Sequence, residues 1–302
     1  MFPIIPAASA ADSGNQEGIF GFGEDGGRTG VTNLVSNAGV VATDVTGVGT
    51  ARSGLAACEY GNDKGIFGYG NTGSIVGTTN LVSNAGVVAS DVTGVGTARY
   101  VLAACSYGGD KGIFGYGYDG SDRVLDSNLV TNLGVVGTDN TIVGSARAYL
   151  TACDYGGDKG IFGFGYTAVA YAGMTNLVSN TGVVSSDVTA VGTARENNAA
   201  CGYGGDKGIF GFGHSAATGY TAITNLVSNA GVVATDVTGV GTARNGLAAT
   251  QYGEDKGIFG FGNTGGGNRV GMTNLVSNAG VVATDVTAVG AVRQYLAACS
   301  FN

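Results

Sequence analysis

Short runs of apolar and β-branched residues alternate with glycine-rich turns along most of the chain, and residues 52 to 95 show the pattern once in full. Leu55–Tyr60 and Lys64–Tyr69 flank a Gly-Asn-Asp turn of the hairpin kind. Thr79–Ser83 and Val87–Val95 flank an Asn-Ala-Gly turn. β-Branched and aromatic residues favour strands. The pattern therefore predicts four short antiparallel strands, the first to fourth strands of a repeat, and no helix.

This pattern recurs six times with a period of about 48 residues. The motif Gly-Ile-Phe-Gly-(Phe/Tyr)-Gly begins at Gly18, Gly65, Gly112, Gly160, Gly208 and Gly257. An arginine recurs at spacings of 47 to 49, at Arg52, Arg99, Arg147, Arg195, Arg244 and Arg293. A period of about 20 to 50 residues indicates a solenoid, a propeller or an array, and four antiparallel strands describe a propeller blade. We therefore predict an all-β fold, a six-bladed β-propeller of four-stranded antiparallel blades.

The two ends of the repeat array are complementary. The first copy begins at its second strand, Gly18–Gly23, whereas the chain ends on an unpaired first strand, residues 294–301. Pairing these segments completes the first blade and removes an open sheet edge. The first strand is rich in Ala-Ala-Cys, and such small side chains suit strands crowded around a central axis. We expect the first strand to be innermost and residues 294–301 to close the ring.

Leu34 to Gly39 and Thr50 to Ala57 match the kelch-type propeller family in strand order and in the arginine before the inner strand, and Ile66 to Gly70 lies where kelch repeats end a strand in a glycine pair. The resemblance covers residues 16 to 302. The sequence departs from it by lacking tryptophan and by spacing its glycines as Gly-x-Gly. The resemblance implies a propeller but not a function, because propellers host many activities. The glycine-rich copies are also similar to repeat proteins of tailed-phage virions.

The composition also favours short strands, and it limits the kinds of binding partner that we expect. The chain has 302 residues, with 58 glycines, two prolines, 44% apolar and 12% charged residues. Interior glycine disfavours helices, the Gly-X-Y period of collagen is missing, and the apolar content argues against disorder. The net charge is −8, so nucleic acid is not an expected partner. No apolar run approaches the length of a membrane helix.

Residues 1–15 precede the first repeat and carry Phe2, Ile4 and Ile5 beside Pro3 and Pro6. They lack the basic region of a signal peptide. We predict that residues 1–15 are an arm that docks the domain of residues 16–302 onto a protein partner.

Five cysteines occupy equivalent positions in the first strand, Cys58, Cys105, Cys153, Cys201 and Cys299, with Thr250 in the sixth. Equivalent positions in neighbouring blades should lie farther apart than the roughly 7 Å that a disulfide allows between Cα atoms. We expect buried, reduced thiols that fill space, and hence folding in a reducing compartment. A ring of thiolates around a metal is a weaker alternative, and no cofactor is expected.

No catalytic arrangement is evident. His214 is the only histidine and lies in a variable loop without a fixed partner, so we expect it to be exposed. Asp119, Asp122 and Asp126 lack the ligand spacing of an EF-hand, and the Gly-x-Gly motifs are not phosphate loops. An aspartate recurs eight residues before each arginine, at Asp44, Asp91, Asp139, Asp187, Asp236 and Asp285. Six copies of Asp and Arg indicate a repeated structural ion pair or turn bond.

Two segments differ strongly between the copies: the loop after the second strand and the pair of residues after the arginine. In an up-and-down blade both emerge on the same face. We predict a binding face from their side chains, namely Arg28, Tyr100, Tyr118, Asp119, Arg123, Tyr149, Tyr166, Tyr171, His214, Tyr220, Arg269 and Tyr295. Tyrosine is common in binding loops because it gives contact area at low entropic cost. The opposite face carries the turn between the first and second strands and the turn between the third and fourth strands. These turns hardly vary between copies, and we call this surface the constant face.

These features favour a non-enzymatic recognition propeller in a larger assembly, such as a virion surface or tail assembled in the host cytoplasm. The constant face and residues 1–15 would meet protein subunits, and the variable face a glycan or cell-surface ligand. The alternative is a lectin-like propeller that acts alone. An enzyme ranks third.

Overall fold

Antiparallel strands of two to five residues make up the regular structure in the part of the chain that the computed structural model describes, residues 16–189, 191–287 and 289–301. The fold is all-β, as expected, and no helix that could span a membrane occurs in these residues. Each repeat contributes an inner, a middle and an outer strand. The inner strands are β3 (Ala56–Tyr60), β6 (Ala103–Tyr107), β10 (Thr151–Tyr155), β13 (Ala199–Tyr203), β18 (Ala248–Tyr252) and β21 (Ala297–Ser300).

The other strands follow the same repeat. The middle strands are β1 (Gly18–Gly21), β4 (Lys64–Gly68), β7 (Lys111–Gly115), β11 (Lys159–Gly163), β14 (Lys207–Gly211) and β19 (Lys256–Gly260). The outer strands are β2 (Thr32–Val35), β5 (Thr79–Val82), β8 (Asp126–Val130), β12 (Thr175–Val178), β17 (Thr224–Val227) and β20 (Thr273–Val276). Three short strands, β9 (Asn140–Thr141), β15 (His214–Ser215) and β16 (Gly219–Tyr220), complete the set.

The expected fourth strand is largely missing. A four-stranded sheet, β6-β7-β8-β9, forms in one repeat, while the described residues of the other repeats form three-stranded sheets. In the repeat of residues 52 to 95, the fourth segment makes only two β-bridges to β5, Val82–Val88 and Thr79–Val92. Val87 and Val92 in this segment are exposed. With solvent on its outer side, the segment is extended but gains too few ladder hydrogen bonds to form a regular strand.

The two ends of the repeat array pair as expected. β21 lies antiparallel to β1, with Gly18 opposite Ser300 and Gly21 opposite Ala297. The sheet β2-β1-β21 therefore takes its inner strand from the end of the chain and its other two strands from the start. The predicted pairing of 294–301 with 18–23 is confirmed. Residues 1–15, with the proposed docking residues Phe2, Ile4 and Ile5, lie outside the described residues.

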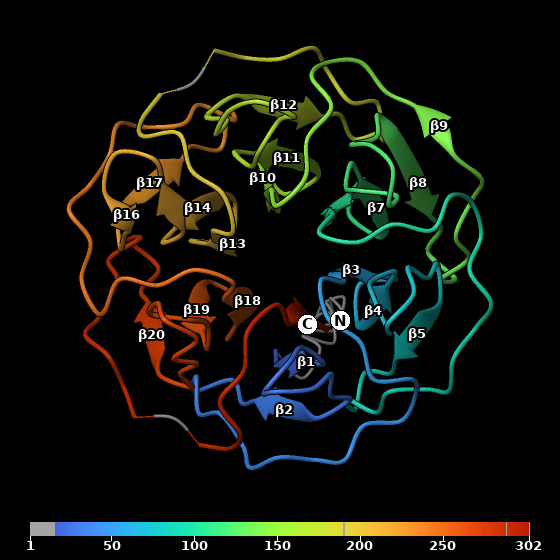
Figure 1. Cartoon of the computed structure of the whole chain (residues 1–302), viewed down its shortest axis with the longest axis horizontal. Helices are drawn as coiled ribbons and strands as arrows, with labels where there is room; N and C mark the ends of the chain where they lie inside the picture. The colour runs from blue at the N-terminus through green and yellow to red at the C-terminus, as the bar shows by residue number, and fades with distance from the viewer. Residues whose placement is uncertain (1–15, 190, 288, 302) are drawn as a thin grey trace, which may run out of the picture.

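The inner strands surround a common centre. Each inner strand contacts the next one around the centre: β3 contacts β6, β6 contacts β10, β10 contacts β13, β13 contacts β18 and β18 contacts β21. The last strand, β21, contacts the first, β3. Figure 1 shows the sheets around this centre, with the inner strands toward it and the long connecting segments at the rim. The expectation that the Ala-Ala-Cys strand is innermost is confirmed.

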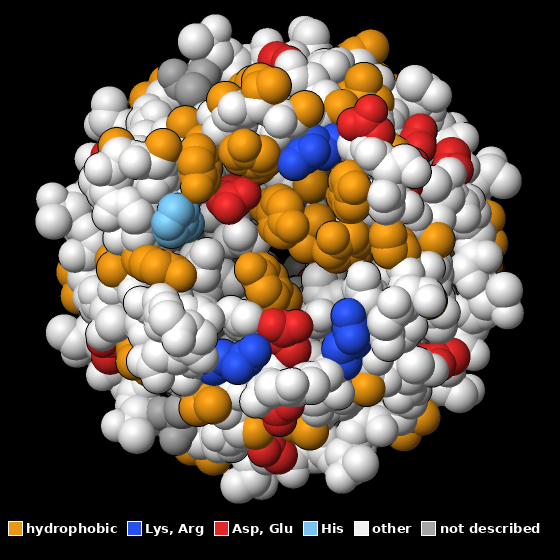
Figure 2. All heavy atoms as spheres, in the orientation of Figure 1, with side chains coloured by type: hydrophobic (Ala, Val, Ile, Leu, Met, Phe, Trp, Pro, Cys, Tyr) orange, Lys and Arg blue, Asp and Glu red, His pale blue; other side chains and the backbone are white. Residues whose placement is uncertain are grey.

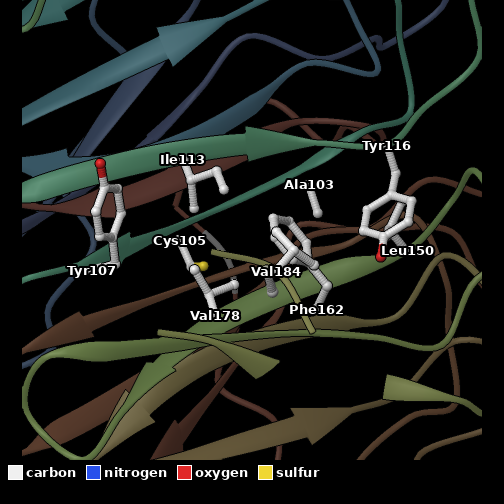
Figure 3. Close-up of a cluster of buried hydrophobic side chains, with 10 residues drawn as sticks. Ala103, Cys105, Tyr107, Ile113, Tyr116, Leu150, Phe162, Val178 and Val184 are labelled. Carbon is white, nitrogen blue, oxygen red and sulfur yellow. The ribbon is translucent and has the colours of Figure 1, made fainter. Parts of the chain in front are cut away.

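The core lies between the faces of neighbouring sheets. One cluster joins Tyr107 and Ile113 of the β6-β7-β8-β9 sheet to Phe162 of the β10-β11-β12 sheet and to Leu150, which precedes β10 (Figure 3). Glycine in the middle strand makes this contact possible, because a Cβ on Gly115 would lie 2.7 Å from Cζ of Phe162. The repeated Gly-Ile-Phe-Gly motif thus supplies both the aromatic ring and the gap that receives the ring of the next sheet.

Candidate functional site

The two segments that vary between repeats meet on one face. The residue after each arginine forms a β-bridge with the loop after the middle strand, and the bridges are Glu24–Gln294, Ser53–Asn71, Tyr100–Tyr118, Ala148–Tyr166, Glu196–His214 and Asn245–Asn263. We call the surface formed by these two sets of loops the variable face. Figure 2 shows it, with hydrophobic side chains gathered around its centre and on one side.

Aromatic side chains of three consecutive repeats form a continuous row on the variable face. Tyr100 packs edge to face on Tyr118, with ring centroids 5.8 Å apart. The Arg123 guanidinium lies 5.8 Å from the Tyr118 centroid and 5.2 Å from that of Tyr166. Its Nε donates to the Tyr166 carbonyl at 3.2 Å. Arg123 therefore links two repeats through cation–π contacts.

The row continues into the next repeat through His214. Tyr166 and Tyr171 pack edge to face at 5.3 Å, and the Tyr171 hydroxyl lies 3.0 Å from His214 Nδ1. Tyr220 packs edge to face on the imidazole, with ring centroids 5.1 Å apart. The expectation that His214 is an exposed loop residue without partners is wrong, because it lies in β15, is half-buried and contacts two tyrosines. We call these seven residues, Tyr100, Tyr118, Arg123, Tyr166, Tyr171, His214 and Tyr220, the aromatic row.

Three further polar side chains lie close to the row. Tyr149 is hydrogen-bonded to Tyr100, and burial raises the pKa of Tyr149 to about 12. Burial also raises the pKa of Tyr295. The pKa of Glu196 is raised by burial, against the opposing charge of Arg123. The two tyrosine hydroxyls therefore stay protonated at neutral pH.

The other half of the variable face is polar. Glu24 accepts from Gln294 Nε2 at 2.7 Å and lies 3.5 Å from Arg269 Nη2. Arg28 is exposed and donates to Asn71 Oδ1 at 2.8 Å. The structure therefore separates the predicted face residues: Arg28 and Arg269 belong to this polar half. Asp119 stabilises its own loop, because its Oδ1 accepts hydrogen bonds from the backbone N–H groups of Ser121 and Asp122.

Six residues at the centre of the variable face form a closed ring of backbone hydrogen bonds. Each N–H donates to the carbonyl of the equivalent residue in the neighbouring repeat, at 2.7 to 2.9 Å, and the members are Gly54, Val101, Tyr149, Asn197, Gly246 and Tyr295. All have φ between 49° and 64°. Glycine adopts this conformation freely, but for β-branched Val101 it is strained. The six residues line a cavity of about 110 Å³.

One buried side chain that lines this cavity has no hydrogen-bond partner. Asn198 stands where the other repeats have leucine, is only 5% exposed, and neither its Nδ2 nor its Oδ1 is bonded within the described residues. An unsatisfied buried amide costs about 1–3 kcal/mol. A polar group that enters the cavity, from water or from a ligand, would remove this cost.

The recurring arginines are structural. Arg52 is fully buried beneath the variable face and donates through Nε to the Tyr69 carbonyl at 2.9 Å and through Nη2 to Asn80 Oδ1 at 2.6 Å. Its guanidinium stacks 4.3 Å from the ring centroid of Phe22 in the neighbouring sheet. Burial lowers the pKa of Arg52 to about 10, against the opposing effect of Asp91.

The expected Asp–Arg ion pairs are present, but each arginine pairs with the aspartate that follows the outer strand of its own sheet. Arg52 Nη1 lies 3.8 Å from Asp91 Oδ1 and not beside Asp44, the aspartate eight residues before it. The other pairs at 3.7 to 3.8 Å are Arg99–Asp139, Arg147–Asp187, Arg244–Asp285 and Arg293–Asp44. In the remaining repeat, the charge of Asp236 acts on Arg195. Each ion pair therefore links the segment before the inner strand to the segment after the outer strand of one sheet.

The cysteines and acidic loops hold no evident metal centre. All five cysteines are buried and free, as predicted, and burial raises the pKa of Cys58 to about 12, so the thiol is the stable form. Asp119, Asp122 and Asp126 do not gather, since no group of three or more His, Cys, Asp and Glu that could hold a metal occurs among the described residues.

The roles of two sets of residues were not predicted from the sequence. One is the asparagine of Thr-Asn-Leu-Val, here Asn80, which links the arginine to Asp91 by accepting from one and donating to the other at 2.8 Å. The other set lies between the cysteine and the aromatic residue of each inner strand, or at the equivalent position, and comprises Glu59, Ser106, Asp154, Gly202, Gln251 and Ser300. We call these the axial residues. Their variation within a nearly constant strand was the available signal.

Comparisons of the sequence with protein-family models and with curated proteins find no match. The kelch and tailed-phage resemblances therefore stay predictions. The functional proposals below depend on the geometry of the described residues.

Proposed function

We propose that the chain is a closed six-bladed β-propeller that acts as a non-enzymatic recognition module. The ring of contacts among the six inner strands supports closure. The backbone hydrogen bonds that run from repeat to repeat around the variable face support it further, as does the pairing of β21 with β1. In this proposal each sheet is one blade, and the extended fourth segment covers its outer edge.

The observation that carries recognition is the position of Arg123 between Tyr118 and Tyr166. The guanidinium lies within 5.8 Å of both ring centroids and so joins the aromatic side chains of two blades into one surface. Tyrosine and arginine are enriched where protein surfaces bind partners tightly. The opposite half of the same face offers mainly exposed polar loops, which marks the aromatic row as the ligand-binding half.

Catalysis has less support. The only histidine, His214, has two tyrosines as its ring neighbours. A nucleophile, a base and a third group that orients the base are required for triad chemistry. The contacts of His214 in the described structure do not supply such a set, so binding without turnover is the function we propose.

A lectin-like activity is the second candidate, and a groove beside the aromatic row favours it. The groove has a volume of about 490 Å³ and is lined by Tyr166, Val169, Ala170, Tyr171, Thr193, Ala194, Ala216 and Ala217. This volume suits a small ligand. Tyrosine rings with an apolar floor can pack on the apolar face of a sugar while hydroxyl groups at the rim donate hydrogen bonds.

We further propose that the constant face attaches the propeller to protein subunits of a larger assembly. Its turns repeat almost unchanged, for example as Lys64 paired with Asp63 and Asn84 donating to Asp63 at 3.3 Å. A surface that always meets the same partner is expected to vary little. A virion surface or tail is one such assembly.

Matched variants on the two halves of the variable face test the proposal. Arg123→Ala and Tyr166→Ala remove the aromatic link, and Arg28→Ala removes an arginine from the polar half. Each protein is applied to a glycan array and is used as bait against cell-surface extracts of candidate hosts. We expect the first two variants to lose at least tenfold in binding of any ligand that the wild type captures, and Arg28→Ala to retain it. Equal binding by all three would contradict recognition by the aromatic row.

A further inference from the structure

Two half-buried side chains of opposite charge lie along the aromatic row without pairing. Arg123 belongs to the row, and Glu196 lies beside it, because the backbone of Glu196 forms a β-bridge with that of His214. The charge of Arg123 acts on Glu196, yet the two side chains form no ion pair in the part of the chain that the structure describes. Figure 2 shows acidic and basic side chains bordering the hydrophobic area of this face. A ligand of the row would therefore meet both charges.

Arg123 retains two guanidinium nitrogens for a ligand. Its Nε donates to the Tyr166 carbonyl, but neither Nη group forms a hydrogen bond or an ion pair with another described residue. The structural arginines differ, since in Arg52 all three guanidinium nitrogens donate hydrogen bonds. A free pair of Nη groups matches the oxygens of a phosphate or a carboxylate. The tyrosines thus position Arg123 and leave it able to bind an anion.

The carboxylate of Glu196 also lacks a bonded partner. The backbone N–H and carbonyl of Glu196 exchange hydrogen bonds of 2.9 Å with His214, whereas its carboxylate accepts none from the residues that the structure describes. On the polar half of the face, by contrast, Glu24 accepts from Gln294 and lies beside Arg269. Glu196 therefore remains available to a positively charged group.

Tyrosine rings lie near the Glu196 carboxylate. Burial raises the pKa of Tyr171 and of Tyr295, and the charge of Glu196 raises both further. The same charge acts on Tyr149, and Tyr149 and Tyr295 line the central cavity of about 110 Å³ together with alanine and leucine side chains. A carboxylate and aromatic faces together attract an alkylated ammonium group, through its charge and through cation–π contacts.

The two charges favour a ligand that carries both signs. A simple cation is attracted by Glu196 but repelled by Arg123, and a simple anion experiences the reverse. Tyr166 and Tyr171 separate the two charges along the row, because Arg123 contacts Tyr166 and Tyr166 packs on Tyr171. The positive and negative groups of the ligand should therefore be several bonds apart, unlike the adjacent charges of an α-amino acid.

We propose that the aromatic row binds a zwitterion of the phosphocholine type, with its phosphodiester at Arg123 and its trimethylammonium group at Glu196. The phosphodiester oxygens accept from the Nη groups, and the methyl groups pack on Tyr149 and Tyr295 at the mouth of the central cavity. A lipid headgroup and a headgroup attached to a surface glycan share this chemistry. This inference rests on the proposed recognition function and names the chemical class of its ligand.

Three soluble ligands test the requirement for both charges. Isothermal titration of the full chain at low salt compares glycerophosphocholine with choline, which lacks the phosphodiester, and with glycerophosphoglycerol, which lacks the ammonium group. We expect glycerophosphocholine to bind at least tenfold more tightly than either. Vesicles of phosphatidylcholine then identify the source. Binding to them indicates a lipid, and binding of the soluble ligand alone indicates a headgroup carried by a glycan, and both results support the proposal.

Two charge-removing variants assign each charge to its partner. Glu196→Gln should bind glycerophosphocholine and glycerophosphoglycerol with affinities within twofold of each other, because the ammonium group loses its partner. Arg123→Gln should likewise lose the preference for glycerophosphocholine over choline. Asp25→Asn and Arg28→Gln make the same changes of charge at exposed positions on the polar half and should keep both preferences. Each preference is a ratio measured within one protein, so a general loss of stability does not imitate the result.

The proposal is overturned if the wild type binds the three ligands equally or binds none of them. It is also overturned if Glu196→Gln and Arg123→Gln keep the preferences of the wild type. A ligand captured on the glycan array through Arg123 and Tyr166, without any preference for glycerophosphocholine, would leave the recognition function standing and reject the zwitterion. Equal capture by the wild type, Arg123→Ala and Tyr166→Ala would reject both.

Discussion

Cys58 Sγ lies 2.5 Å from the position that a Cβ on Gly112 would occupy. The same contact recurs between the inner strand of one sheet and the middle strand of the next. The sixth copy has Thr250, whose Cγ2 lies 2.8 Å from the Cβ position of Gly18. The repeated cysteine and the repeated glycine therefore have one explanation. The thiol fills the space that the glycine leaves, and sheets meet closely enough that no larger pair fits.

A methyl group added at this contact should destabilise the protein, and a smaller partner should rescue it. Gly112→Ala forces an overlap with Cys58 and should cost about 1–3 kcal/mol. In the double variant Gly112→Ala, Cys58→Ala, the methyl group enters the space vacated by sulfur, so part of the loss should return. Urea unfolding of the four proteins gives the coupling free energy. If the two single losses simply add, the residues are not in the contact described.

Removal of one buried arginine should be far more damaging than removal of an exposed one. In Arg99→Met the carbonyl of Tyr116 and the Oδ1 of Asn128 lose the hydrogen bonds that the guanidinium supplies. Breaking a buried charged network typically costs about 3–5 kcal/mol. Arg28→Met, at an exposed position, should change stability by less than about 0.5 kcal/mol. Denaturant midpoints with unchanged slopes would give both values, and similar losses in the two variants would argue against the structural role.

Stability should fall steeply in acid because of the repeated aspartates. Burial tends to raise the pKa of Asp139, but hydrogen bonds from Asn128 and Thr97 and the charge of Arg99 outweigh it, so the pKa is lowered. A carboxyl whose folded pKa is depressed stabilises the fold above its unfolded pKa, ordinarily 3.8, and this contribution is lost as pH falls through the folded value. Unfolding free energies between pH 6 and pH 2 should show this loss. Asp139→Asn should be less stable at pH 6 and should lose less on acidification than the wild type, and an unchanged slope would exclude Asp139 as a contributor.

Truncation after Arg293 should abolish cooperative unfolding. It removes β21, leaves one edge of β1 unpaired and takes Cys299 and Phe301 from the core beside Phe67. Calorimetry should show no sharp transition, and a peptide of residues 294–301 added in trans should restore it where a scrambled peptide does not. A truncated protein that melts like the full chain would rule out closure by this strand.

The elements with the strongest repetition were the easiest to predict. Gly-Ile-Phe-Gly marks a strand in every repeat and Ala-Ala-Cys, or a close variant of it, marks another, and the predicted boundaries agree with the structure to within three residues. The fourth strand was overpredicted because β-branched residues such as Val87 and Val92 indicate extended backbone, whereas a regular strand also needs a partner on its hydrogen-bonding edge.

The candidate site was predictable only in outline. Variation between copies identified the variable face, but not that Arg123 would join Tyr118 to Tyr166, because that contact depends on how neighbouring sheets are placed. The spacing of residues along the chain also could not show that Arg52 pairs with Asp91. Every repeat carries the same aspartate and arginine, and Asp44 is nearer to Arg52 in the sequence. A pattern that repeats identically does not show which copy of a recurring residue pairs with which.

The antiparallel pairing of β1 with β21 also determines how the protein would respond to mechanical force. Gly18 and Ser300 face each other at the end of the ladder where the chain leads to its two termini. Tension applied between the termini would open this ladder one hydrogen bond at a time, by unzipping, which needs far less force than shearing all of its bonds together. A particle that holds this protein under load would therefore keep it folded best if the load did not act between the two ends of the chain.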